Sequence, residues 1–87
     1  MIELVSGNGN VLELVPFSIS RLEERLFVDG ITMGSVNDVM AYLEDMVGSG
    51  IAVDYGSRTI IGRVIEYSIE SSEDGSVVKV SVEVEVE

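Results

Sequence analysis

The side chains that carry most enzymatic chemistry are missing from this chain, which has no histidine and no cysteine among its 87 residues. Dyads and triads built on an imidazole or a thiol are therefore impossible. The remaining nucleophile pair would join Ser81 to Lys79, the only lysine, on the polar side of one predicted strand. That setting offers nothing to activate the pair, so we predict no catalytic residue and no enzymatic activity.

The chain also has few side chains suited to bind a metal or a cofactor. Sites that favour zinc or iron need histidine or cysteine ligands. Glu83, Glu85 and Glu87 project from one face of a predicted strand, where same-face residues lie about 6.6–7 Å apart. That spacing is too wide for two carboxylates to grip one calcium ion tightly. We therefore predict no metal site and no cofactor.

The segment that holds these glutamates has the most regular pattern in the chain. From Ser76 to Glu87, apolar and polar residues alternate without interruption, which is typical of a half-buried strand. Residues 59–70 form a second such run, and the Ser-Glu-Asp-Gly sequence between the runs favours a tight turn. We predict a long C-terminal β-hairpin. One face of its first arm carries Ile61, Arg63, Ile65, Tyr67 and Ile69, and one face of its second arm carries Val78, Val80, Val82, Val84 and Val86.

This hairpin is long for a chain of this size. An arm of twelve residues spans about 40 Å, whereas a compact body of this length has a diameter of roughly 30 Å. Two solutions remain open. Either the ribbon coils strongly, with a bend at Gly62, and closes a small barrel, or its tip projects as an arm whose valine face is covered by another subunit.

A helix is predicted for residues 35–47. Ser35 and Asp38 form a cap at its start, and apolar residues recur at helical spacing up to Val47, after which Gly48 is placed to end the helix. Elsewhere, the Gly-Asn run at residues 6–10 predicts a hairpin turn, and Asp29-Gly30 predicts another. Residues 20–26 fit a short helix or a strand, and the sequence leaves that choice open.

Together these elements predict a single domain of the α+β class that spans residues 1–87. Its centre is a strongly twisted antiparallel β-sheet or a small, partly open barrel of roughly five to seven strands. The helix at residues 35–47 packs on one face, and the long hairpin forms the C-terminal end. The chain starts without a basic segment or a long apolar run, so we expect neither a signal peptide nor a membrane span.

The net charge of −11 narrows the choice of partners. Contacts to nucleic-acid phosphates need lysine and arginine, so direct nucleic-acid binding is not expected, and anionic membranes are disfavoured for the same reason. A basic protein surface remains compatible with this charge. Small secreted domains are usually stapled by disulfides, so the lack of cysteine favours a cytoplasmic or virion location.

We expect a non-enzymatic structural or assembly module that self-associates or docks into a larger complex through strand edges and its C-terminal hairpin. An apolar content of 46% in so short a chain supports this expectation. Small valine-rich β domains with a long terminal hairpin and few lysines resemble accessory proteins of tailed-phage virions, which makes a virion component one form of this function. The candidate interaction residues are Val78, Val80, Val82, Val84 and Val86, together with Glu83, Glu85 and Glu87.

The alternative is a small acidic inhibitor that mimics nucleic acid and presents its carboxylates to a basic groove of another protein. Exposed charges are screened over about 10 Å or less at ordinary salt, so added salt would release such an inhibitor but not an apolar interface. A third candidate, a barrel that binds a small ligand, needs a pocket that the sequence cannot show.

Overall fold

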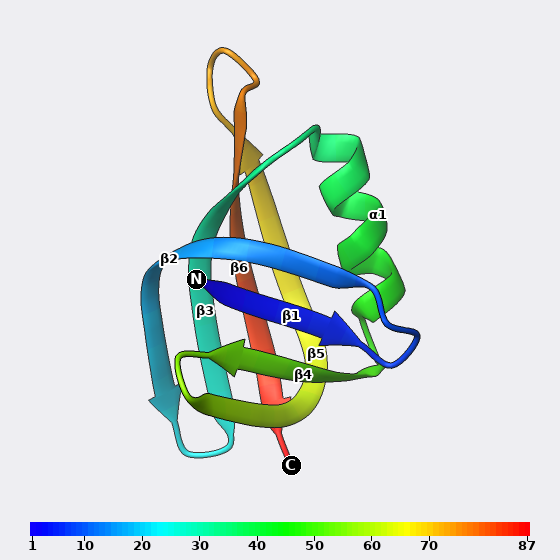
Figure 1. Cartoon of the computed structure of the whole chain (residues 1–87), viewed down its shortest axis with the longest axis vertical. Helices are drawn as coiled ribbons and strands as arrows, with labels where there is room; N and C mark the ends of the chain where they lie inside the picture. The colour runs from blue at the N-terminus through cyan, green and yellow to red at the C-terminus, as the bar shows by residue number, and fades with distance from the viewer.

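The computed structural model describes residues 1–87, which form six strands and one helix (Figure 1). Helix α1 spans Val36–Met46. The strands are β1 (Ile2–Ser6), β2 (Val11–Leu22), β3 (Arg25–Met33), β4 (Gly50–Tyr55), β5 (Arg58–Ser71) and β6 (Val77–Val86).

The six strands close into a barrel in the order β1-β2-β3-β6-β5-β4, and every neighbouring pair is antiparallel. The predicted α+β class, with an antiparallel barrel and one helix, is therefore confirmed. The barrel is closed, however, and not partly open or a simple twisted sheet. Closure occurs because β1 pairs with β4 on one side while it pairs with β2 on the other.

A corner in β2 makes this closure possible. The strand pairs with β1 up to Leu14 and with β3 from Val15 onward, and the register shifts at a bulge between Pro16 and Ser18. Gly30 lies where β2 crosses β3, and a Cβ placed on it would come within 2.8 Å of the Val15 carbonyl oxygen. The prediction of a turn at residues 29–30 is therefore wrong. This glycine lies inside β3 and allows a close strand approach.

A second bulge lies in β5, where the register shifts between Val64 and Glu66. Val64 is buried inside the barrel, but beyond the bulge the residues that face inward are Tyr67 and Ile69. The prediction that Ile61 shares a face with Tyr67 is wrong, because one extra residue shifts the side-chain alternation by one position.

Residues 20–26 are not helical. Residues 20–22 complete β2, Glu23 and Glu24 form a tight turn, and β3 begins at Arg25. Glu23 takes a φ of 56°, in the left-handed region that such turns need. Leu26 is fully buried in the barrel interior, which favours the strand because a half-exposed pleat places every second residue inside.

Helix α1 begins as predicted. The Ser35 hydroxyl accepts a hydrogen bond from the backbone N–H of Asp38 at 3.1 Å, and Gly48 after the helix takes a φ of 80°. Val39, Leu43 and Met46 are its buried residues. The apolar stripe and both end signals are thus confirmed, with the last helical residue one position earlier than expected.

The helix covers the part of β5 that β4 leaves unpaired. The ladder between β4 and β5 ends at Gly50 and Arg63, and the chain after α1 contacts β5 there, since the Gly48 N–H donates to the Val64 carbonyl at 2.9 Å. Beyond that point β5 and β6 continue as a pair whose loop extends past the rest of the body (Figure 1).

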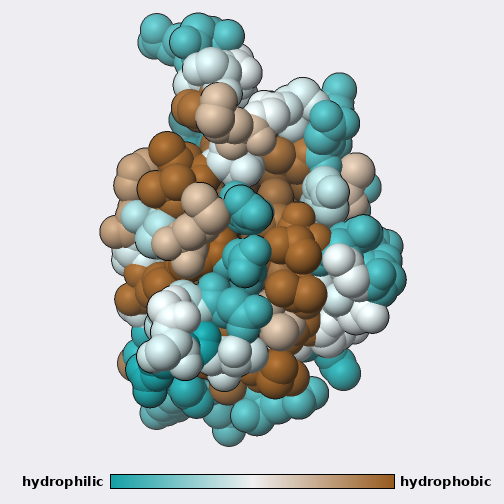
Figure 2. All heavy atoms as spheres, viewed as in Figure 1, coloured by the Kyte–Doolittle hydropathy of each residue, from teal (hydrophilic) through white to brown (hydrophobic).

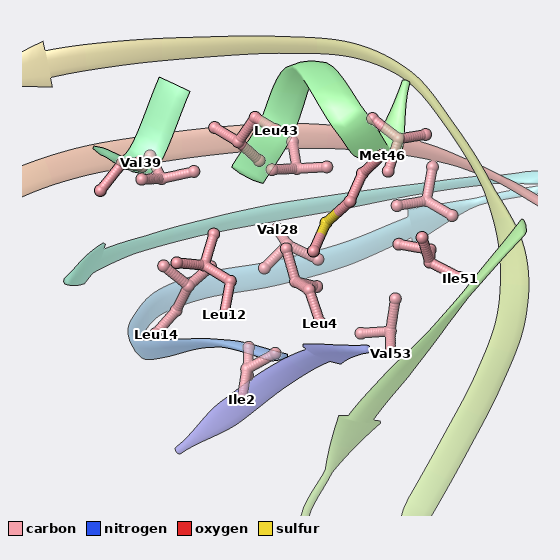
Figure 3. Close-up of a cluster of buried hydrophobic side chains, with 14 of the residues drawn as sticks. Ile2, Leu4, Leu12, Leu14, Val28, Val39, Leu43, Met46, Ile51 and Val53 are labelled. Atoms are coloured by element: carbon pink, nitrogen blue, oxygen red, sulfur yellow. The ribbon is translucent and has the colours of Figure 1, made fainter. Parts of the chain in front are cut away.

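Sixteen buried apolar side chains from α1 and all six strands fill the barrel. Figure 3 shows side chains of β1, β2, β3 and β4 converging with those of α1. The valine face of β6 belongs to this core: Val78, Val80 and Val84 have no exposed area, and Val86 is half-buried. The barrel therefore covers the valines of β6, and the longest extent of the molecule is 37 Å.

No helix of the chain combines the length and apolarity needed to cross a membrane.

Candidate interaction surface

The structure separates the residues that the sequence analysis grouped as an interaction site. The valines of β6 lie inside the barrel, where the same chain packs against them. They are therefore not available to a partner in this fold. Their burial explains the uninterrupted alternation in the sequence without any second subunit.

The glutamates of β6 lie on the opposite, outer side of the strand. Glu83 forms an ion pair with Arg25 and accepts a hydrogen bond from its guanidinium at 2.7 Å, and a Glu85 carboxylate oxygen lies 3.6 Å from the same guanidinium. Arg25 stands directly across from Glu85 in the ladder between β3 and β6. Glu87 is exposed at the end of the chain. Two of the three predicted acids thus already have a cation, which weakens their case as a free acidic surface.

A different outer surface combines apolar and acidic residues in parallel rows. The outward side chains of β1 are Met1 (just before the strand), Glu3 and Val5, and those of the neighbouring part of β2 are Val11, Glu13 and Val15. The hairpin register places Glu3 opposite Glu13 and Val5 opposite Val11. Like residues therefore line up across the strands, although apolar and acidic residues alternate along each strand.

The pairing with β4 and β5 continues these rows. Glu3 stands opposite Asp54, and Val5 stands opposite Ala52, which in turn stands opposite Ile61. We call this outer side of β2, β1, β4 and the start of β5 the striped face. Its acid row consists of Glu13, Glu3 and Asp54, one apolar row consists of Val11, Val5, Ala52 and Ile61, and the other consists of Val15 and Met1.

The apolar rows are accessible. Met1 is 70% exposed, Val15 52% and Ile61 48%, while Val5 and Ala52 are half-buried. Figure 2 shows hydrophilic atoms in a line down the front of the body with hydrophobic atoms on both sides of it. Single exposed apolar residues are common, but aligned rows of them are typical of contact surfaces.

The acid row lacks any cation of its own. The ion pairs of the molecule involve only Arg25, so no lysine or arginine nitrogen lies within 4 Å of Glu3, Glu13 or Asp54. Asp54 accepts a hydrogen bond from the Thr59 hydroxyl at 2.5 Å. Side chains directly opposite in a ladder have Cβ atoms about 5 Å apart, and like charges at that distance oppose folding. The carboxylates do not gather into a group of three that could hold a metal ion.

A groove of about 480 Å³ adjoins one edge of the striped face. It opens where β2 leaves β3, since the ladder between them ends at Val15 and Ile31 while β3 continues to Met33. Met1, Val15 and Met33 line it, and Met33 is 81% exposed. The apolar surface therefore extends from the striped face toward β3 and β6.

Lys79 lies beyond this groove on the outer side of β6. Its ammonium nitrogen is 5.9 Å from the centre of the Phe17 ring, within the range of a cation–π contact. Ser81 is two residues from Lys79 on the same strand, and the two side chains line one shallow hollow. No hydrogen bond joins them.

A carboxylate with a shifted pKa lies in the β5–β6 loop. The pKa of Asp74 is lowered to about 2 because the Ser76 hydroxyl, the Ser76 backbone N–H and the Ser72 hydroxyl donate to its carboxylate. These hydrogen bonds hold a tight, exposed turn. They organise the loop.

Sequence reasoning missed the striped face although half of its signal was present. The N-terminal hairpin was predicted, and a five-residue connection at residues 6–10 places Glu3 across from Glu13. Asp54 could not be added in this way, because β1 and β4 are far apart in the chain and pair only when the barrel closes.

No protein-family model matches the chain, and no curated protein or solved structure matches it.

Proposed function

We propose that this chain is a non-enzymatic assembly module that docks onto another protein in a larger complex through its striped face. The observation that supports this most is the pair of exposed apolar rows on either side of three unpaired carboxylates. Folding gains nothing from such a pattern. A binding surface gains apolar contact area and a fixed orientation from it.

The charge of the face favours a different protein over a second copy. Two striped faces in contact would bring two acid rows together, and like charges across an interface cost several kcal/mol. The end of β3 that β2 leaves unpaired, at Thr32 and Met33, and the projecting β5–β6 loop offer further contacts in such a complex. A virion, in which the chain would be an accessory protein, is one setting for a small module of this kind.

Native mass spectrometry of the tagged chain, purified from the cells or particles that contain it, tests the proposal. We expect a complex heavier than the chain alone that persists at about 300 mM salt, because apolar contacts resist screening. The V15T/I61T double variant should lose the complex, whereas Leu22→Gln, at a side chain that is 69% exposed outside the striped face, should keep it. A chain that remains monomeric in its native setting would refute the assembly function.

The acidic-inhibitor hypothesis remains the second candidate, and the acid row is the observation that favours it. Strands lie about 4.8 Å apart, so the row offers a line of regularly spaced negative charge to a basic groove. That function depends on charge alone. It predicts that V15T/I61T binds its target as well as the natural chain does, and that about 300 mM salt releases the target.

A further inference from the structure

We propose that the striped face binds a basic amphipathic helix of the partner, laid across the strands of the barrel. This inference rests on the proposed assembly function and adds the chemistry and the secondary structure of the partner segment. Three observations carry it: the spacing of the acid row, its lack of cations and the apolar rows on its two sides.

The spacing of the acid row matches a helix better than a strand. Glu13, Glu3 and Asp54 stand on three adjacent strands, and strand axes are about 4.8 Å apart. One face of a helix repeats every 5.4 Å, so lysine or arginine at positions i, i+4 and i+7 would meet one carboxylate each. Residues on one face of an extended segment repeat about every 6.6–7 Å, which does not match.

The apolar rows lie under the two sides of such a helix, beside its basic stripe. Along β1, Met1 and Val5 are each two residues from Glu3, and along β2, Val11 and Val15 are each two residues from Glu13. Two residues of strand cover about 7 Å, and a helix with its side chains is about 10–12 Å wide. Apolar side chains that flank the basic stripe of the partner would therefore contact both rows at once.

The uncompensated negative charge of the acid row favours a partner segment with positive charge. The acid row has no cation within 4 Å, and the ammonium group of Lys79, the only lysine of the chain, is already placed over Phe17. A helix with a lysine or arginine stripe would relieve the repulsion within the row. An acidic helix or a second copy of this chain would increase it.

The test uses the full chain labelled with ¹⁵N and a synthetic helical peptide with lysine at every i, i+4 and i+7 position and leucine on both sides of that stripe. Two control peptides replace all leucines by glutamine, or keep the composition and scramble the order. We expect the first peptide to shift the amide signals of residues 2–5, 11–15 and 52–54. Both controls should bind at least tenfold more weakly.

Two charge-reversal variants of the chain make the test specific. Glu3→Lys, in the middle of the acid row, should weaken peptide binding at least tenfold. Glu73→Lys, in the exposed β5–β6 loop, makes the same change in net charge and should leave binding within about twofold. Equal losses for both variants, equal binding of the glutamine or scrambled peptide, or shifts confined to other strands would each overturn the helix proposal.

Self-association through the striped face is the remaining outcome that would count against the helix proposal. If sedimentation shows a dimer that Glu3→Lys abolishes, the striped face binds a second copy and the proposal is wrong. The proposed assembly function fails separately, by a monomeric chain in its native setting. A native complex that V15T/I61T disrupts but whose partner contributes no basic helix would refute this inference alone.

Discussion

The acid row makes Glu3→Lys a substitution that should stabilise the fold. Glu3 is the only member of the row with a carboxylate on both sides, since it faces Glu13 in β2 and Asp54 in β4. Replacing it by lysine turns two repulsive cross-strand pairs into two attractive ones. The side chain points outward and is only half-buried, so the longer lysine can reach solvent without disturbing the core.

The size of the effect follows from the ladder geometry. Two unit charges about 5 Å apart in water interact by roughly 0.8 kcal/mol, and 0.1 M salt reduces this further. Measured cross-strand charge pairs contribute about 0.2–1 kcal/mol each. Two reversed pairs should therefore add about 1–2 kcal/mol to the free energy of unfolding. In a domain of this length, each kcal/mol raises the Tm by about 4–8 °C.

Thermal and urea unfolding of four variants would measure this. Glu13→Lys should gain about half as much as Glu3→Lys, because it faces only one carboxylate of the row. Glu3→Gln should fall between the natural chain and Glu3→Lys, and all three gains should shrink between about 20 mM and 0.5 M salt. Glu73→Lys reports the effect of net charge alone. If Glu3→Lys were no more stable than Glu73→Lys, the repulsion that we assign to the acid row would not exist. A variant that folds more tightly yet loses its partner would identify the acid row as a feature kept for binding.

Three further predictions test the fold that presents this face. Gly62→Ala should destabilise the barrel by about 1–3 kcal/mol, because the new Cβ would overlap the Glu85 carbonyl oxygen and lie 2.7 Å from a Val84 methyl. Gly50→Ala is the matched control, since the nearest atom there is 4.0 Å away, and equal stability of the two variants in urea unfolding would argue against a close approach of β5 and β6 at Gly62. Leu43→Ala should cost about 2–5 kcal/mol in the same assay, whereas Leu22→Ala at an exposed position should change stability by less than about 0.5 kcal/mol; a small effect at Leu43 would mean that α1 does not seal the core. Asp74 should titrate in an NMR experiment with a pKa of about 2, and Ser76→Ala should raise that value. Since the pKa in the folded chain lies below the ordinary aspartate value of 3.8, the turn is stabilised above pH 3.8 and loses this contribution as the pH falls toward 2. A midpoint near 3.8 in the natural chain would contradict the hydrogen-bonded turn.

Local chemistry explains which parts of the fold were predictable. The helix has its own start and stop signals in Ser35 and Gly48, and each acts on neighbouring backbone groups. The alternation of β6 is equally local, because a strand with one buried face must place every second residue inside. The absence of histidine and cysteine likewise excludes imidazole and thiol chemistry in any fold.

The errors share a physical cause, which is the approach of segments far apart in the chain. Asp29-Gly30 has the composition of a turn, but Gly30 lies inside β3 because β2 crosses it closely at Val15. The valines of β6 predict an apolar face that needs a cover, and nothing in their spacing says whether that cover is another subunit or the rest of the same chain. The closed barrel supplies it internally.

Residue types and neighbours within a few positions were enough to predict the helix, the alternating strands, the acidic charge and the absence of imidazole and thiol groups. The exposed surface, in contrast, depends on how distant strands pair. Pairing of β1 with β4 brings Asp54 beside Glu3 and aligns Ala52 with Val5. That alignment depends on the register of barrel closure, and a shift of one residue would turn every one of these side chains to the other face.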